Sequence, residues 1–373
     1  MKQKLSWLVT VVASVALGAG AVVGIDSLRD DNGGNSATVI ERVSEPTSSG
    51  VADTGISDVA DLYAKVRPSV VQINSSSSTS RNGNGLGSGI VLDRDGHILT
   101  NNHVIANGEQ FDVQFADGSA VSATLLGTDP GNDLALLKVN VASNKLQPAT
   151  LGDSEKVRVG EFVIAVGNPF GIEGSLTSGI VSGVGRTLSG GTGRPLRQLI
   201  QSDAAINPGN SGGALFNRRG EVIGITTAIE NPSGNRVFAG IGYAVPVNAA
   251  SRYLPDLIAG KTVQHPRMGV GLQNLTPALA KSLNIGVEQG VLLTQVDANG
   301  AAAKAGLRGG IGLRGQPVGD VVLSIDGKET KTYDDLANYI DSKNVGDKVS
   351  VKYFRDGKES TVDVTLEAWR AAS

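Results

Sequence analysis

The chain has 373 residues, with 33 basic and 36 acidic side chains and a formal net charge of −3. This balance gives no broad positive field and argues against a nucleic-acid-binding protein. The absence of Cys excludes disulfides, a thiol nucleophile and zinc–thiolate sites. The length suits two domains and a leader. The 50 glycines, well above the average usage of roughly 7%, favour many short strands joined by tight turns.

Residues 1–25 predict a signal-anchor, or transmembrane, segment. Lys2 and Lys4 precede an uncharged stretch from Leu5 to Ile25, whose 21 residues would cross a hydrocarbon core of about 30 Å as a helix. Ala19-Gly20-Ala21 leaves cleavage as the alternative, although the stretch exceeds the roughly 7–15 apolar residues of a signal peptide. The positive flank predicts that the remaining chain lies outside the cytoplasm. Residues 26–55, rich in Ser, Gly and Thr, read as a flexible linker.

Residues 56–262 predict a first domain made of short strands. It opens with a helix over Ile56–Val66 that ends before Pro68, and it closes with a helix over Arg252–Ala259 followed by Gly260. Strands this short and this regularly spaced indicate an antiparallel barrel or sandwich. The predicted strands are Val70–Ile73, Gly89–Leu92, Ile98–Thr100, Phe111–Phe115, Ala135–Val139, Phe162–Ala165, Ala214–Asn217 and Val222–Ile225.

Residues 263–373 predict a smaller α+β unit with two helices. One helix is capped by Thr276. The other begins after Thr332 and has Asp335 three residues on, which is the pattern of a capping box. The predicted strands lie near Val270, Val291–Thr294, Val321–Ile325 and Val349–Tyr353.

Gly209-Asn210-Ser211-Gly212-Gly213 is the sharpest local motif. Glycines allow a tight turn that presents a serine together with backbone N–H groups. The motif also fits a plain glycine-rich hairpin and the nucleophile elbow of α/β-hydrolases. An elbow requires a following helix and the order Ser, acid, His. Here a hairpin pattern follows, and the only downstream histidine is His265 beside Pro266, so we reject the elbow.

Two upstream residues complete a possible catalytic set in the order His, Asp, Ser. His103 ends a predicted strand and, alone, would more often be a structural histidine. Asp133 lies in a turn before an apolar strand, where Asp129 has an equal claim to the role of turn cap. Of the other histidines, His97 is predicted to be a solvated hairpin residue and His265 a linker residue.

Together these segments resemble the HtrA/DegP-type family of chymotrypsin-fold serine proteases, and the resemblance covers roughly residues 56–370. It implies a mainly β fold: a chymotrypsin-like double antiparallel β-barrel in residues 56–262, followed by an α+β PDZ domain in residues 263–373. The segments that carry the resemblance are Thr100–Val104, Asn132–Leu134, Leu151–Ser154, Gly167–Gly171, Gly209–Gly213 and Gly240–Pro246.

The resemblance implies a serine endopeptidase of extracytoplasmic protein quality control and stress response, located in the periplasm or on the outer face of the membrane. Ser211 would attack the peptide carbonyl, His103 would act as general base, and Asp133 would hold the imidazole. The backbone amides that would form the oxyanion hole are those of Gly209, Ser211 and Asn210.

Substrate-binding residues follow from the same resemblance. An apolar specificity pocket would favour small or medium apolar residues, an edge strand would pair with unfolded polypeptide, and a PDZ loop would receive peptide C-termini. Arg267 departs from the aromatic residue usual before that loop. The residues are Ala205, Ile206 and Ile241 for the pocket, Thr226, Thr227 and Ala228 for strand pairing, and Met268, Gly269 and Val270 for the PDZ loop.

The resemblance also implies a homotrimer and no cofactor. A metalloprotease is excluded because HExxH is absent and the three histidines are scattered. The competing hypothesis is a non-hydrolytic chaperone or peptide-binding scaffold, in which the barrels would only support the PDZ unit. It predicts suppression of aggregation without cleavage of peptide bonds.

Overall fold

The computed structural model describes residues 58–77, 85–168, 174–189, 193–207, 209–229, 240–312 and 317–369. The chain divides into two compact units, Met1–Ala52 and Asp53–Ser373, and every described residue belongs to the second. The predicted signal-anchor and linker therefore lie outside the described residues. Within the described ranges, no helix has the length and apolarity needed to cross a membrane.

The described chain begins with helix α2 (Val59–Val66), which confirms the helix predicted before Pro68. Asp58 caps it by accepting from Ala60 N, and its buried face carries Leu62 and Val66. A short 3-10 helix, η1 (Arg67–Ser69), leads into the first strand.

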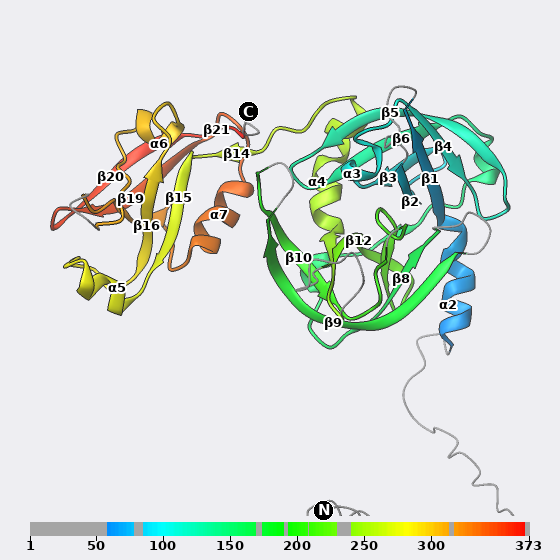
Figure 1. Cartoon of the computed structure of the whole chain (residues 1–373), viewed down its shortest axis with the longest axis horizontal. Helices are drawn as coiled ribbons and strands as arrows, with labels where there is room; N and C mark the ends of the chain where they lie inside the picture. The colour runs from blue at the N-terminus through cyan, green and yellow to red at the C-terminus, as the bar shows by residue number, and fades with distance from the viewer. Residues whose placement is uncertain are drawn as a thin grey trace, which may run out of the picture. The chain divides into compact units, whose positions relative to one another are not determined.

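Six antiparallel strands then form a closed barrel in the order β1-β2-β3-β6-β5-β4 (Figure 1). Its interior is filled by a cluster of fully buried apolar side chains that includes Val71, Ile73, Ile98, Val113 and Leu137. The strands are β1 (Val70–Ser76), β2 (Gly85–Val91), β3 (His97–Thr100), β4 (Gln110–Gln114), β5 (Ala120–Asp129) and β6 (Leu134–Val139).

A second six-strand barrel follows, in the order β11-β8-β9-β10-β13-β12, closed by pairing of β12 with β11. The short strand β7 (Thr150–Leu151) pairs in parallel with β12, and the 3-10 helices η2 (Ser143–Lys145) and η3 (Ser154–Lys156) flank it. The barrel strands are β8 (Phe162–Gly167), β9 (Ser175–Leu188), β10 (Leu196–Ser202), β11 (Ala214–Asn217), β12 (Glu221–Ile229) and β13 (Gly242–Pro246).

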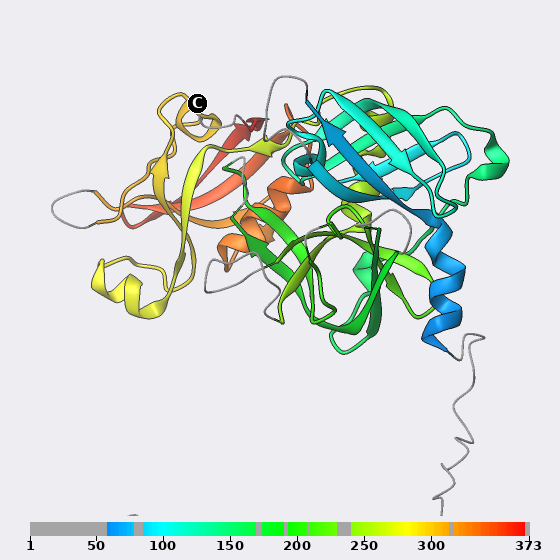
Figure 2. The same cartoon turned by 45° about the vertical axis from the view of Figure 1, so that its right-hand side comes forward.

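A shared apolar cluster joins the two barrels. It contains Ile90 and Leu134 from the first barrel and Phe216 and Ile225 from the second, all fully buried. The fold is thus the predicted double antiparallel barrel. Figure 2 shows the curved strands of the two barrels in a second view.

Two helices of this region differ from the sequence predictions. The residue His103 does not end a strand, because β3 stops at Thr100 and one helical turn, α3 (Asn102–Ile105), follows. The closing helix α4 (Val247–Ile258) begins five residues before the predicted Arg252. Its N-cap is Pro246, which makes no side-chain capping bond, so the usual polar start signal is missing from the sequence.

The elements that follow α4, from Pro266 to Ala368, are called the C-terminal unit. Its sheet has the order β15-β16-β17-β19-β20, with β18 paired to β17, and β14 and β21 form a separate ribbon. Both predicted caps are present: Thr276 caps α5 and Thr332 with Asp335 forms the capping box of α7, while α6 was not predicted. The elements are β14 (Pro266–Arg267), β15 (Val270–Leu275), α5 (Pro277–Ser282), β16 (Gly290–Val296), α6 (Ala301–Lys304), β17 (Val321–Ile325), β18 (Lys328–Glu329), α7 (Tyr333–Asp341), β19 (Lys348–Arg355), β20 (Lys358–Thr365) and β21 (Glu367–Ala368).

Candidate active site

His103 and Asp133 meet where α3 follows β3 and where the β5–β6 turn ends. The Nδ1 atom of His103 lies 2.7 Å from Asp133 Oδ2, and the His103 backbone N–H donates to Asp133 Oδ1 at 2.9 Å. The His103 side chain is 49% exposed and that of Asp133 15% exposed. With Nδ1 held by the carboxylate, the other ring nitrogen, Nε2, is left for a reacting group.

Thr227 connects this pair to Ser211. Its hydroxyl donates to Asp133 Oδ2 at 2.5 Å, and its backbone carbonyl accepts from Ser211 Oγ at 3.4 Å. The structure thus brings His103, Asp133 and Ser211 together around one residue of β12. In the described part of the chain, the hydrogen bond of the Ser211 hydroxyl goes to this carbonyl and none joins it to His103.

The turn that carries Ser211 is packed against the first barrel. Ser88 N donates to Ser211 O at 2.7 Å, and Ser88 Oγ donates to Gly209 O at 2.7 Å. Gly212 has a φ of 84°, and a Cβ there would lie 2.2 Å from Ser88 O and 2.4 Å from Thr100 Oγ1. A side chain at 212 would therefore collide with the segment that leads to His103, which explains why the motif needs glycine at this point.

The amides predicted for the oxyanion hole are not equivalent. Asn210 N donates to Asn207 O at 3.0 Å, so this N–H is already used within the turn. No backbone carbonyl among the described residues accepts from the N–H of Gly209 or Ser211. Of the three predicted donors, the N–H groups of Gly209 and Ser211 therefore remain available.

The residues predicted to form the specificity pocket lie close to one another. Ile206 is buried, and a Cβ placed on Gly242 would be 2.7 Å from Ile206 Cδ1. Ile241 packs against the shared apolar cluster. Ala205 O accepts from Thr177 Oγ1 at 2.8 Å, which fixes the segment before Ile206.

The segment predicted to pair with substrate is partly used by the fold itself. Thr226 N donates to Gly213 O and Thr226 O accepts from Gly212 N, so neither backbone group of Thr226 is open to a substrate strand. This corrects the prediction for Thr226. The register of β12 against β13 shifts between Thr226 and Ala228, which leaves Thr227 as the bulged residue.

A cavity of about 430 Å³ lies between β15 and α7, which are in contact in the structure and adjacent in Figure 1. The predicted loop residues Met268, Gly269 and Val270 all line it, with Gly269 at a φ of 75°. Leu272 and Ile340 are among the apolar lining residues of the two walls. The segment that leads into β10, together with the start of that strand, also lines the cavity, through Gly193, Arg194, Pro195 and Arg197.

Arg267, the residue that departs from the expected loop pattern, is bound within the unit. Its guanidinium contacts Asp297 at 3.1 Å and Glu367 at 2.9 Å and lies 5.7 Å from the centre of the Trp369 ring. The contact with Glu367 joins the two strands of the β14–β21 ribbon, and the contact with Asp297 joins this ribbon to the end of β16.

Neither of the other histidines is placed as predicted. His97 is not solvated: its side chain is 12% exposed and its Nδ1 lies 2.6 Å from Asp93 Oδ2. His265 is not an exposed linker residue: it is 3% exposed and pairs with the buried Asp129. The His265 pair could not be predicted from local sequence, because Asp129 lies 136 positions away.

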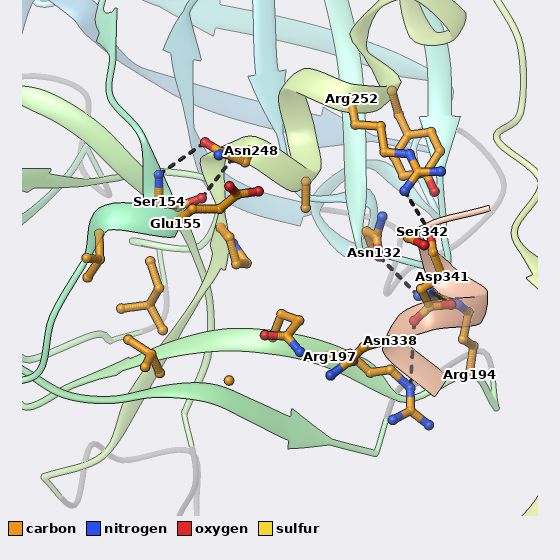
Figure 3. A pocket seen from close by; sticks show the side chains of 18 residues that line it. Asn132, Ser154, Glu155, Arg194, Arg197, Asn248, Arg252, Asn338, Asp341 and Ser342 are labelled. Carbon is orange, nitrogen blue, oxygen red and sulfur yellow. Dashed lines mark hydrogen bonds and ion pairs between the residues drawn. The ribbon is translucent and has the colours of Figure 1, made fainter. Parts of the chain in front are cut away.

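A second cavity, of about 550 Å³, is lined by residues of β9, β10, α4 and α7 (Figure 3). Arg194 forms an ion pair with Asp341 of α7 at 2.9 Å, and Arg252 donates to Asp341 O at 2.8 Å. Asn132, which precedes Asp133, is the lining residue nearest in sequence to the candidate catalytic residues. No group of three or more metal-binding side chains occurs in the described ranges.

Comparison with known proteins gives matches over both regions. A trypsin-like peptidase domain model matches residues 87–225 and a PDZ domain model matches residues 266–366. The chain is similar to a probable periplasmic serine endoprotease DegP-like of Brucella suis biovar 1 (strain 1330), with 41% identity over 282 residues, covering 76% of this chain and 52% of the relative. A relative of the same name from Pseudomonas putida (strain F1) is 42% identical over 288 residues, or 77% of this chain and 57% of the relative.

Solved structures match over a larger share of their length. An HtrA-type protease AlgW with decapeptide has a TM-score of 0.69 and 32% identity, covering 83% of this chain and 98% of that one. A serine endoprotease from Yersinia pestis has a TM-score of 0.63 and 28% identity, covering 84% and 99%. The chain spans only about half the length of the curated relatives named above. On the double barrel, the PDZ domain and these similarities, the chain belongs to the HtrA-type serine protease family.

Proposed function

We propose that this chain is a serine endopeptidase that cleaves unfolded or misfolded proteins outside the cytoplasm. The observation that carries the proposal is the shared contact at Thr227. Asp133 Oδ2 receives both His103 Nδ1 and the Thr227 hydroxyl, while the Thr227 carbonyl receives the Ser211 hydroxyl. A base, its orienting acid and a serine in a glycine turn are the parts that acyl transfer requires.

In the proposed reaction, Ser211 Oγ attacks the substrate carbonyl and His103 Nε2 takes its proton, then returns it to the leaving amine. Asp133 keeps Nδ1 protonated and stabilises the imidazolium. Because Ser211 Oγ donates to Thr227 O at 3.4 Å, the side chain must turn toward His103 before attack. The N–H groups of Gly209 and Ser211 would receive the oxyanion, an interaction worth about 100–1,000-fold for each donor.

We infer the substrate-binding mode from the apolar residues near Ser211 and from strand β12. Ile206 and Ile241, with Ala205, would accept small or medium apolar side chains at the cleavage site. Thr227 and Ala228 would pair with an extended substrate segment, and this mode of binding needs unfolded polypeptide.

The C-terminal cavity is proposed to capture a peptide C-terminus at Met268, Gly269 and Val270. The apolar walls of β15 and α7 would hold the last side chain. A fluorescent peptide with an apolar C-terminal residue should bind, whereas the same peptide with an amidated C-terminus should not. Equal affinity for both peptides would contradict carboxylate capture.

We also propose the location and the assembly of the protein from its resemblance to the family. Residues 1–25 would anchor the chain in the membrane, residues 26–55 would act as a tether, and the protease domain (56–262) and PDZ domain (263–373) would lie in the periplasm or on the outer face of the membrane. Three copies would form a homotrimer, as the family resemblance implies. The relatives' printed names, which call them periplasmic, support the location.

The test is cleavage of unfolded casein by the purified chain and by Ser211→Ala. The proposal predicts fragments from the wild type and none from the variant. Ser119→Ala, in an exposed turn of the first barrel, is the matched control and should cleave like the wild type. Undiminished cleavage by Ser211→Ala would refute the proposal. Aggregation suppression without cleavage by the wild type would favour the scaffold alternative.

A further inference from the structure

A buried histidine–aspartate pair lies directly behind the turn that ends in Asp133, outside the proposed triad. His265 Nε2 is 2.5 Å from Asp129 Oδ1, and the two side chains are 3% and 0% exposed. A buried carboxylate is costly unless donors surround it. Asp129 meets this requirement by accepting from His265 and from Asn132.

Asp129 holds the turn that presents Asp133. Its Oδ1 accepts from Asn132 N at 3.1 Å and its Oδ2 accepts from Asn132 Nδ2 at 2.9 Å, so both N–H groups of Asn132 end on this carboxylate. The next residue, Asp133, has a φ of 57°. A non-glycine residue keeps such a left-handed backbone only where its surroundings fix it.

His265 presses on the same turn from the chain segment that follows α4. A Cβ on Gly131 would lie 2.3 Å from His265 Cδ2, so the imidazole ring lies directly against the turn backbone. The edge of the ring meets Tyr253 at a centroid distance of 5.0 Å. The segment before His265 is itself held to the end of β5 through Thr128 N to Lys261 O and Val263 N to Thr128 O.

Arg194 also secures the turn. Its Nη1 donates to Gly131 O at 2.7 Å. The same atom donates to Asn132 Oδ1 at 3.0 Å, and Figure 3 shows both of these side chains. Arg194 does not bind the two N–H groups of Asn132, which both donate to Asp129. Within the described residues, His265 is the one donor to the Asp129 carboxylate from outside the turn. Loss of the His265 bond would therefore leave Asp129 free to shift together with Asn132.

We propose that His265 is a positioning residue for the catalytic carboxylate: through Asp129 and Asn132 it holds Asp133 at the distance His103 requires. The inference rests on the proposed function, because Asp133 matters only if the triad works. Among the described residues, the hydrogen bond of the His265 side chain goes to Asp129 and not to His103 or the proposed specificity pocket, so its loss should act on the chemical step. Displacement of a catalytic group by about 1 Å can cost about 100-fold in rate.

The experiment compares His265→Leu with His265→Gln in the full chain, using an unfolded peptide substrate. Leu fills the space but cannot donate. Gln places an N–H near the position of Nε2, and the imidazole uses only that nitrogen, since Nδ1 has no hydrogen-bond partner among the described residues. We expect kcat to fall about 10–100-fold in His265→Leu with little change in KM, and His265→Gln to recover most of the loss.

The matched control is His97→Leu. It removes a second His–Asp pair of similar length, 2.6 Å, from the β2–β3 hairpin without touching the Asp133 turn. It should keep kcat within about twofold of the wild type. If His265→Leu does not fold, His265→Asn, whose amide is too short to reach Asp129, carries the same expectation.

The outcomes separate the two hypotheses. Wild-type cleavage that survives Ser211→Ala overturns the proposed function, and with it the role of His265. Wild-type cleavage that Ser211→Ala abolishes, with folded His265→Leu retaining full kcat, overturns the role of His265 alone. A loss shared equally by His265→Leu and His265→Gln, or one confined to KM, also overturns it.

Discussion

At the residue scale, the candidate site depends on Thr227 as much as on the three residues that define the chemistry. Asp133 accepts two donors at Oδ2, from His103 and Thr227, and one at Oδ1 from the His103 backbone. This arrangement fixes the carboxylate in one orientation. The carboxylate in turn fixes the tautomer of His103, because Nδ1 must donate to it.

Sequence alone gave the order of His103, Asp133 and Ser211 but not the residues that align them. The turn around Ser211 could be recognised because its glycines are close neighbours of the serine in the sequence. The role of the Thr227 hydroxyl could not be predicted, because its partner Asp133 lies 94 positions away. The bond from Ser88 to Gly209 could not be predicted either, because the two residues are 121 positions apart. Contacts of this range arise only when the two barrels pack together.

The Thr227 hydroxyl should therefore matter for catalysis. Thr227→Val keeps the shape of the side chain and removes the donor to Asp133 Oδ2, so the carboxylate loses one of its supports. We expect kcat to fall about 10-fold, equivalent to about 1.4 kcal/mol, with KM nearly unchanged. Steady-state kinetics on a peptide substrate would measure this. Thr227→Ser keeps the hydroxyl and should restore most of the activity; equal rates for the Val and Ser variants would contradict the role.

At the element scale, the predicted start of a helix was correct where a capping side chain marks it in the sequence. Thr276 and Thr332 are side-chain caps, and both helices begin where these residues predict. Helix α4 begins after Pro246 without such a cap, and its predicted start was wrong. The single turn α3 has too few residues for any periodic pattern, so the helical placement of His103 could not be read from the sequence.

The capping box of α7 predicts a pH-dependent contribution to stability. Burial raises the pKa of Asp335, but hydrogen bonds from Thr332 and Lys331 outweigh it and hold the pKa below its ordinary value of 3.8. A carboxyl whose pKa is lower in the folded state stabilises the fold above its unfolded pKa, and this contribution disappears as the pH falls through the folded pKa. The stabilisation is thus complete near neutrality and lost in acid.

Asp335→Ala should accordingly cost about 0.3–1 kcal/mol of unfolding free energy at neutral pH, and the difference from the wild type should shrink below pH 3.8. Urea denaturation followed by far-UV circular dichroism over a pH series would measure it. A difference that stays constant or grows in acid would show that the carboxylate is not the stabilising group.

At the scale of the whole molecule, ion pairs connect the second barrel with α7 of the C-terminal unit. Arg194 is buried and pairs with Asp341 at 2.9 Å, whereas the more exposed pair Arg197–Asp334 has a distance of 3.3 Å. Strand spacing predicted an antiparallel barrel or sandwich, and the family resemblance implied the two barrels and the PDZ domain. These contacts between the parts could not be predicted, because nothing local marks Arg194 as buried.

Removing the two carboxylates should therefore have unequal effects. Asp341→Ala leaves the buried guanidinium of Arg194 without its carboxylate, and we expect a loss of about 1–3 kcal/mol in unfolding free energy. Asp334→Ala removes a partly exposed partner and should cost at most about 1 kcal/mol. Chemical denaturation of both variants would compare them. Equal losses would contradict the difference in burial on which the expectation depends.

The most direct test of the central claim is to identify the residue that an active-site fluorophosphonate modifies in the folded protein. Digestion and mass spectrometry should find a single adduct, on Ser211, and none in Ser211→Ala. His103→Ala should label at least about 1,000-fold more slowly, because the hydroxyl loses its base. An adduct on another serine, or undiminished labelling of Ser211→Ala, would contradict the assignment.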